Sequence, residues 1–202
     1  MKRDVKKHQR ANGAIRIISG RWRGRKLPVL DVSGLRPTTD KNKETLFNWL
    51  MPYTQGSRCL DAFAGSGSLG FEALSRDAPY ATFIEWDKKV AATLQQNLAL
   101  LKVEAAQAQV ITGDTLAVLG QLAEPYDLIF LDPPFNHNLL PQCIPLIAEH
   151  GLLQSGGIIY IECETQNAHY PVPANWQLLK QQQGKQVVAR LYQNVGECRV
   201  RI

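Results

Sequence analysis

The chain of 202 residues carries 23 Lys and Arg against 18 Asp and Glu, which gives it a net charge of +5. Its length suits one well-cored domain with some tens of residues to spare, and its composition is that of a soluble globular protein. No apolar run approaches the length of a membrane span, and the first residues lack the hydrophobic segment of a secretory signal. We therefore expect a cytoplasmic location and no membrane contact.

The four cysteines are widely separated and include no CxxC pair. That spacing argues against a zinc site and against a disulfide framework. We expect reduced thiols and no bound metal, as in a cytosolic protein. The cysteines are Cys59, Cys143, Cys163 and Cys198.

The positive charge is concentrated near the N-terminus. Residues 1–44 contain 13 Lys and Arg against 4 Asp and Glu, a net charge of +9, whereas the rest of the chain has a net charge of −4. If only the charge is considered, a solvated tail would be a sufficient explanation. However, Arg21-Trp22-Arg23-Gly24-Arg25-Lys26 interleaves arginines with a tryptophan and a glycine. This pattern favours a polyanionic partner.

The first 52 residues are expected to lie outside the cofactor domain. Residues 1–13 are polar, basic and without periodicity, which predicts a disordered tail. Residues 14–52 are expected to form a basic extension that binds the polyanion. In it, Ile15–Gly20 and Arg25–Val29 flank a Gly-containing turn, the pattern of a small β-hairpin.

The turn of this hairpin gathers Arg21, Arg23, Arg25 and Lys26, which can present positive charge to a phosphate backbone. Further along, residues 37–40 supply N-cap candidates for a helix of about a dozen residues that ends before Pro52.

Residues 53–202 are expected to form the second domain. Strands and helices alternate along it, which predicts a mostly parallel sheet with helices on both faces. The last two strands surround Gln183-Gly184-Lys185 and leave no room for a crossover helix, so they predict a closing antiparallel hairpin. The preceding strand candidates are Cys59–Phe63, Ala81–Glu85, Gln109–Thr112, Tyr126–Leu131 and Ile158–Glu162.

A glycine-rich turn after the first of these strands indicates a nucleoside-bearing cofactor. Gly65, Gly67 and Gly70 satisfy the GxGxxG pattern between a predicted strand and a predicted helix. Glu85 follows 20 residues after Gly65, at the end of the next strand, where a carboxylate can accept hydrogen bonds from both ribose hydroxyls. The combination is far more specific than the glycines alone.

Asp61 bears on which cofactor is bound. A carboxylate just upstream of the glycine turn would oppose a pyrophosphate at the helix N-terminus but would favour a cation. Asp61 therefore favours S-adenosylmethionine, which carries a sulfonium and an ammonium group, over NAD or FAD. Asp114 can accept from an adenine amino group or can serve as a helix N-cap, and the two roles are compatible.

Asp132-Pro133-Pro134-Phe135 follows the strongest strand candidate. Two consecutive prolines donate no ladder hydrogen bonds, so the strand must end there in a stiff turn. The turn places a carboxylate and an aromatic face at the carboxyl end of a strand, where ligands of open α/β sheets bind. These groups suit a planar substrate with an exocyclic amine. A turn with an incidental Phe is the alternative.

Two groups of motifs resemble a known family. Asp61-Ala62-Phe63-Ala64-Gly65-Ser66-Gly67 and the Asp-Pro-Pro-Phe turn resemble class I S-adenosylmethionine-dependent methyltransferases that modify exocyclic amines. Motifs near the N-terminus resemble, more specifically, the bacterial 16S ribosomal RNA guanine-N2 methyltransferase family. They are Arg16-Ile17-Ile18-Ser19-Gly20, Arg23-Gly24-Arg25-Lys26-Leu27-Pro28, Leu35-Arg36-Pro37-Thr38-Thr39-Asp40 and Glu44-Thr45-Leu46-Phe47-Asn48-Trp49-Leu50. The resemblance runs from about Ile15 to about Tyr192.

The resemblance implies a seven-stranded Rossmann-like sheet, and we expect the enzyme to be a monomer. It implies methylation of one guanine N2 amine in 16S rRNA of the assembling small subunit. Asp132 and the Pro133 carbonyl would accept the hydrogens of the amine, and Phe135 would stack on a flipped or unpaired guanine. Pro134 completes the turn. The cofactor residues would be Asp61, Phe63, Gly65, Gly67, Glu85 and Asp114, and the RNA-binding residues would be Arg21, Arg23, Arg25, Lys26 and Arg36.

The residues leave three alternative functions open. A nicotinamide-dependent oxidoreductase would use the glycines but not the Asp-Pro-Pro-Phe turn. A DNA or protein-glutamine methyltransferase would use that turn but not the arginine-rich hairpin. A non-catalytic RNA-binding protein would use the hairpin but would not need Asp61, Glu85 and Asp132 together.

Overall fold

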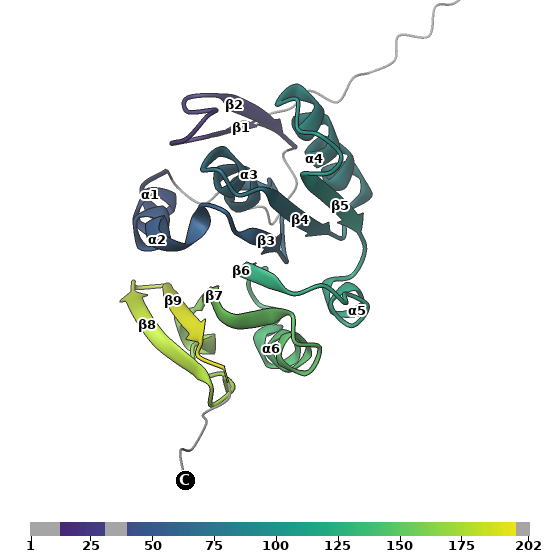
Figure 1. The fold of residues 1–202 in the computed structure, drawn as a ribbon. Helices are drawn as coiled ribbons and strands as arrows, with labels where there is room; N and C mark the ends of the chain where they lie inside the picture. Colours follow the sequence, from purple (N-terminus) through teal and green to yellow (C-terminus); the bar gives the residue numbers. More distant parts are fainter. Residues whose placement is uncertain (1–12, 31–39, 197–202) are drawn as a thin grey trace, which may run out of the picture.

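The computed structural model describes residues 13–30 and 40–196. Its centre is a seven-stranded sheet in the order β5-β4-β3-β6-β7-β9-β8, and a separate two-stranded sheet precedes it in the chain (Figure 1). The large sheet contains β3 (Arg58–Asp61), β4 (Tyr80–Glu85), β5 (Ala108–Thr112), β6 (Tyr126–Leu131), β7 (Leu153–Glu164), β8 (Trp176–Gln183) and β9 (Val187–Asn194). This architecture confirms the predicted fold class.

The connections of the sheet create a switch point between β3 and β6. The chain passes outward from β3 to β4 and β5, then returns to place β6 on the other side of β3 and β7 beyond it. All pairs among these five strands are parallel, whereas β9 is antiparallel to β7 and to β8. Ligands of such sheets bind at the carboxyl ends of the strands beside the switch point.

Helices cover both faces of the sheet (Figure 1). One hydrophobic cluster joins a face of the sheet to α1, α3 and α4, and the other joins the opposite face to α5 and α6. The helices are α1 (Asp40–Trp49), α2 (Met51–Thr54), α3 (Ser68–Ser75), α4 (Lys88–Leu100), α5 (Thr115–Leu119) and α6 (Leu140–Glu149), and a short 3-10 helix spans Thr165–Asn167. None of the helices described here is long and apolar enough to cross a membrane.

The predicted boundaries differ from the observed ones mainly in β7. This strand begins at Leu153, five residues before the predicted start, because Leu153 already pairs with Tyr126 of β6. The pairing then shifts register, and Ile158 pairs with Leu128. Glycines are unfavourable inside strands, so the sequence of this irregular stretch does not predict a strand.

The N-terminal hairpin consists of β1 (Gly13–Arg16) and β2 (Lys26–Val29), as predicted. It packs on α3 and α4 and shares the hydrophobic cluster of the sheet through Ile15, Ile17 and Leu27. The division at residue 52 remains a prediction, as does the disordered tail. Residues 1–12, Arg36 and Cys198 lie outside the described residues.

A buried glutamate of α3 anchors the hairpin. Both carboxylate oxygens of Glu72 accept backbone hydrogen bonds from the hairpin, from Ile18 at 2.9 Å and from Ser19 at 3.0 Å. Glu72 also accepts from Arg76 at 2.9 Å and forms an ion pair with Lys43 of α1 at 3.6 Å. Glu72 and Lys43 are almost completely buried, so the Lys43 ammonium depends on the charge of Glu72, whereas Glu72 also has Arg76.

Close backbone packing reinforces this anchor. Gly20 adopts a φ of +80°, and a Cβ atom on it would lie 1.8 Å from the carbonyl oxygen of Ser75. Ser75 accepts from the backbone N–H of Arg21 through that carbonyl and of Trp22 through its hydroxyl. The hairpin is therefore held on α3 at backbone distance, which only a glycine permits.

We predict that Glu72→Gln lowers the free energy of unfolding by about 3–5 kcal/mol, because it leaves the buried Lys43 ammonium without a counter-charge. The matched control is Asp40→Asn, which breaks the Arg16–Asp40 ion pair between two half-exposed side chains and removes a charge that acts on Lys43 more weakly than Glu72 does. This control should cost less than about 1 kcal/mol. Urea unfolding measures both, and equal losses in the two variants would contradict the anchor role of Glu72.

Candidate active site

Four carboxylates lie at the carboxyl ends of four neighbouring strands. Asp61 ends β3, Glu85 ends β4, Asp132 directly follows β6, and Glu162 lies near the end of β7. Since these strands are adjacent and parallel, their carboxyl ends meet at one edge of the sheet, on both sides of the switch point. We call these four residues the acidic row.

The register of the strands places the acidic row on one face. Asp61 pairs with Phe83 of β4 and with Phe130 of β6. Residues in register on parallel strands point to the same face, and so do residues two apart on one strand. Glu85 follows Phe83 by two residues, and Asp132 follows Phe130 by two. Both carboxylates therefore extend the face that α1, α3 and α4 cover.

The turn between β3 and α3 has the backbone geometry that the glycine pattern predicts. Gly65 and Gly67 adopt φ values of +51° and +75°. Gly67 occupies the N-cap position of α3, and a Cβ atom on Gly70 would lie 2.2 Å from the ring of Phe83. The first two glycines allow the turn, and the third allows α3 to lie close to β4.

Glu85 organises this turn. Its carboxylate accepts from the backbone N–H of Gly65 at 2.9 Å and of Asp87 at 2.8 Å. Burial raises the pKa of Glu85, and these two hydrogen bonds offset part of that effect. Each carboxylate oxygen has two lone pairs, so Glu85 retains acceptor capacity for further donors.

Asp61 is the more deeply buried acid, with 3% of its surface exposed. Burial raises its pKa to about 7, against a hydrogen bond from Gly70 that lowers it, and the charge of Glu85 raises it further. Nearby, at the start of α3, the buried hydroxyl of Ser68 has no hydrogen-bond partner among the described residues. A cationic, hydrogen-bonding ligand would stabilise the charged form of Asp61 and could satisfy Ser68.

The hairpin and α4 lie against the glycine turn. Val29 and Leu30 line a small pocket together with Gly65 and with side chains of α4. The pocket is lined by Val29, Leu30, Gly65, Ser66, Val90, Thr93 and Leu94. The hairpin therefore contributes residues beside the predicted cofactor turn, although the sequence reading placed it outside the cofactor domain.

The Asp-Pro-Pro-Phe turn ends β6, as the two prolines predict. Asp132 is half-buried, and its carboxylate accepts no hydrogen bond from any described residue. Burial raises the pKa of Asp132, as do the charges of Glu162 and Asp61. Pro133 is buried and Phe135 half-buried. The turn thus holds an acceptor with unused capacity beside an aromatic ring.

The loop after this turn is tied to β7. The backbone N–H of Asn136 donates to Glu164 at 2.8 Å, and Asn136 itself adopts a φ of +66°. His137, in the same loop, is exposed. The bond to Glu164 fixes where the loop leaves the active edge.

Glu162 was not among the site residues predicted from the sequence. Glu85 was predicted because it is an acid at the end of a predicted strand. Glu162 is the last residue of another predicted strand, so the same criterion could have identified it. Burial raises the pKa of Glu162, and a hydrogen bond donated by the Tyr160 hydroxyl partly opposes this effect. The structure brings Glu162 to the same edge as the three predicted acids.

The remaining predicted cofactor residues lie less centrally. Asp114 is exposed and caps α5 by accepting from Ala117 at 3.0 Å, so its N-cap role is confirmed and its adenine contact stays a prediction. Phe63 packs against the hydrophobic cluster beneath α5 and α6, on the other face of the sheet from the acidic row.

The predicted RNA-binding side chains Arg21, Arg23, Arg25 and Lys26 are all exposed. None of them forms an ion pair with a carboxylate of residues 13–30 or 40–196. Arg21 stacks on the Trp22 ring at 4.1 Å, and Arg25 donates to the carbonyl of Leu100 at 3.4 Å. The arginine charges therefore remain available to an external anion.

Known proteins resemble this chain over almost its whole length. A family profile described as "Conserved hypothetical protein 95" matches residues 15–193. A relative named "Ribosomal RNA small subunit methyltransferase D" in Haemophilus influenzae is 54% identical over 91% of this chain and 96% of its own. The protein of the same name in Escherichia coli is 50% identical over 95% and 96%.

Solved structures agree with these sequence matches. The structure of Escherichia coli yhhF, described as a methyltransferase, superposes with a TM-score of 0.85 at 50% sequence identity. It covers 92% of this chain and 100% of its own. The fold is therefore that of the Rossmann-like methyltransferases, and the chain belongs to the family described as Conserved hypothetical protein 95, which includes the small-subunit rRNA methyltransferase D proteins.

Proposed function

We propose that this protein is a cytoplasmic, monomeric enzyme that methylates the exocyclic N2 amine of one guanine in 16S rRNA of the assembling small subunit. The proposal depends on one observation: the half-buried carboxylate of Asp132 receives no hydrogen bond from any of the described residues. It stands at the switch point, on a rigid turn beside Phe135. The names of the relatives support an rRNA substrate, and the chemistry of the turn supports an amine.

The residues at the glycine turn fit S-adenosylmethionine. Asp61 and Glu85 provide negative charge where a pyrophosphate would be repelled, and the buried Ser68 hydroxyl lacks a partner among the described residues. Asp61 would bind near the cationic groups, Glu85 would hold the ribose hydroxyls, and Gly65 would allow close backbone approach. When bound, S-adenosylmethionine supplies an electrophilic methyl group on its sulfonium.

The residues of the turn would orient the amine. The lone pair of a guanine N2 amine is delocalised into the ring, so the amine is a weak nucleophile and catalysis depends on positioning. Asp132 and the Pro133 carbonyl would accept its two hydrogens and so direct the lone pair, while Phe135 stacks on the base. The raised pKa of Asp132 also makes it a competent acceptor for the proton that the nitrogen loses.

The hairpin would bind the RNA backbone. Its exposed arginines carry charge opposite to that of rRNA, and the anchor at Glu72 fixes them relative to α3, which begins at the glycine turn. Phosphate contacts of this kind position a nucleic acid without reading its sequence. The hairpin would therefore orient the RNA, and the acidic row would select and position the base.

The proposal is tested with purified protein, S-adenosylmethionine and small subunits from a strain that lacks the enzyme. We expect N2-methylguanine at one rRNA position. Asp132→Ala should reduce the single-turnover rate by at least about a hundred-fold while cofactor affinity stays within a few fold, since its interaction matters mainly in the transition state. A near wild-type rate in this variant would remove Asp132 from the mechanism.

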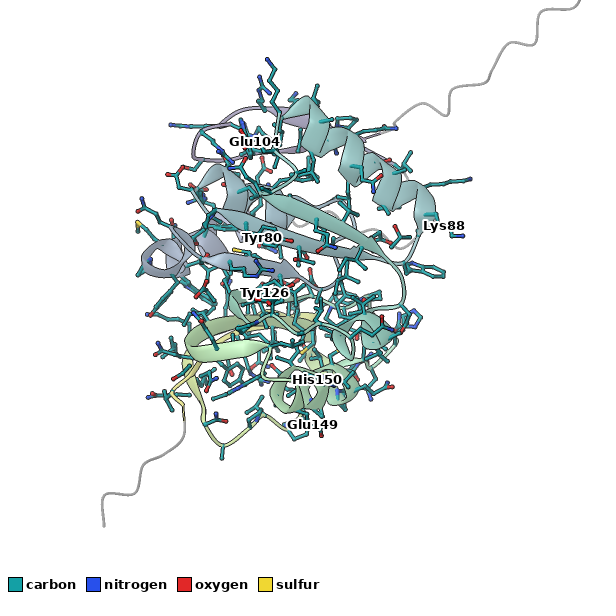
Figure 2. The ribbon with its side chains drawn as sticks, turned by 45° about the vertical axis from the view of Figure 1, so that its right-hand side comes forward. Tyr80, Lys88, Glu104, Tyr126, Glu149 and His150 are labelled. Carbon is teal, nitrogen blue, oxygen red and sulfur yellow. The ribbon has the colours of Figure 1, made fainter. Side chains whose placement is uncertain are left out.

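We predict that Glu85→Ala weakens S-adenosylmethionine binding by about 1.5–3 kcal/mol, the range for hydrogen bonds to a charged acceptor. The matched control is Glu104→Ala, because Glu104 lies at the opposite end of α4 from Lys88 and the active edge (Figure 2). Isothermal titration should give wild-type affinity for the control. Unchanged affinity in a folded Glu85→Ala protein would refute the ribose assignment.

We predict that replacing Arg21, Arg23 and Arg25 together by Gln flattens the log-affinity versus log-salt slope for rRNA by about two to three units. S-adenosylmethionine affinity should remain unchanged, and kcat/KM should fall more than kcat because substrate capture is weakened. If the arginines only dock the hairpin, the variant will instead lose thermal stability at an unchanged slope. Both quantities are measured on one preparation.

A further inference from the structure

The register of β6 and β7 places Glu162 beside Asp132. Leu131 of β6 pairs with Ile161 of β7. Asp132 directly follows Leu131, and Glu162 directly follows Ile161. Adjacent strands lie about 4.8 Å apart, and residues at the same level of parallel strands point to the same face. The two carboxylates therefore lie next to each other at the active edge, and the charge of Glu162 raises the pKa of Asp132.

Tyr160 fixes the orientation of Glu162. The two residues are two apart on β7 and so share a face, and the Tyr160 hydroxyl donates to one carboxylate oxygen of Glu162. Tyr160 is itself buried in the cluster that contains Phe130. Burial and the charge of Glu162 keep its pKa well above the ordinary value, so the hydroxyl remains a donor. The second carboxylate oxygen of Glu162 has no hydrogen-bond donor among the described residues.

Two adjacent carboxylates match the edge of guanine that carries the N2 amine. On that edge the N1–H donor is next to the two hydrogens of N2. In the same orientation adenine presents an acceptor at N1 and no amine at C2, and with its N6 amine in the place of N2 it still sets the N1 acceptor against the second carboxylate. The half-buried carboxylates repel each other until donors approach them, and a base with adjacent donors relieves that repulsion.

We propose that Glu162 is the specificity-determining residue that accepts a hydrogen bond from guanine N1–H, while Asp132 accepts from the neighbouring N2 amine. This inference rests on the proposed function. Tyr160 is a positioning residue that holds Glu162 toward the base. A site built to bind a donor rejects bases that lack it, because its buried acceptor is then left unpaired. The Asp132–Glu162 pair thus selects guanine before the amine is methylated.

The test compares guanine with 2-aminopurine, which keeps the exocyclic amine but presents an acceptor at N1. Reconstituted small subunits carry one or the other at the position that the wild-type enzyme methylates. We expect the wild type to prefer guanine in single turnover. Glu162→Gln should narrow that preference by about ten- to a hundred-fold, because the glutamine amide can donate to the N1 of 2-aminopurine. Tyr160→Phe, which keeps the buried ring, should narrow it in the same direction but less.

Two controls separate a specificity role from a structural one. Glu149→Gln, at the end of α6 (Figure 2), should leave the base preference at the wild-type value. S-adenosylmethionine affinity should be unchanged in all three variants. If the wild type methylates guanine but Glu162→Gln and Tyr160→Phe keep its full preference over 2-aminopurine, this inference is wrong and the proposed function stands. If the wild type forms no N2-methylguanine, the proposed function itself fails.

Discussion

The active edge depends on the parallel register of β4, β3, β6 and β7. Because these strands are adjacent and run in one direction, each contributes its carboxyl end to the same edge, and register sets which side chains share a face. Acids at equivalent places on the four strands then form one row. Burying such a row without nearby cations costs free energy, which is why the pKa values of all four acids are raised. The row is complementary to ligands that bring cations or hydrogen-bond donors.

The same arrangement connects the basic hairpin with the acidic row. Glu72 holds the hairpin to α3, and α3 begins at the glycine turn whose position Glu85 fixes. The basic hairpin and the acidic row are therefore linked through α3 and the glycine turn. The hairpin carries exposed positive charge, whereas the row presents carboxylate acceptors at the edge of the sheet.

Much of this could be predicted from the sequence. Apolar runs bounded by glycines and prolines gave the strands of the parallel sheet, and the signals at Gly65, Glu85 and Asp132 are local. The early start of β7 could not be predicted, because only pairing with Tyr126 makes that stretch a strand. The Glu72–Lys43 anchor and the Asp132–Glu162 pair join residues distant in sequence, so they depend on packing and register. Phe63 shows another limit, since its place in a local motif gave no information about which hydrophobic cluster its side chain would pack against, and its cofactor contact stays a prediction.

The central proposal is that the protein methylates a guanine N2 amine in small-subunit rRNA, with the acidic row binding cofactor and base. It is tested most directly by nucleoside mapping of that rRNA from a strain that lacks the protein, with and without a plasmid that restores it. The account predicts that one N2-methylguanosine is absent from the deletion strain and returns with the plasmid. If the N2-methylguanosine content is the same in both strains, the claim is contradicted.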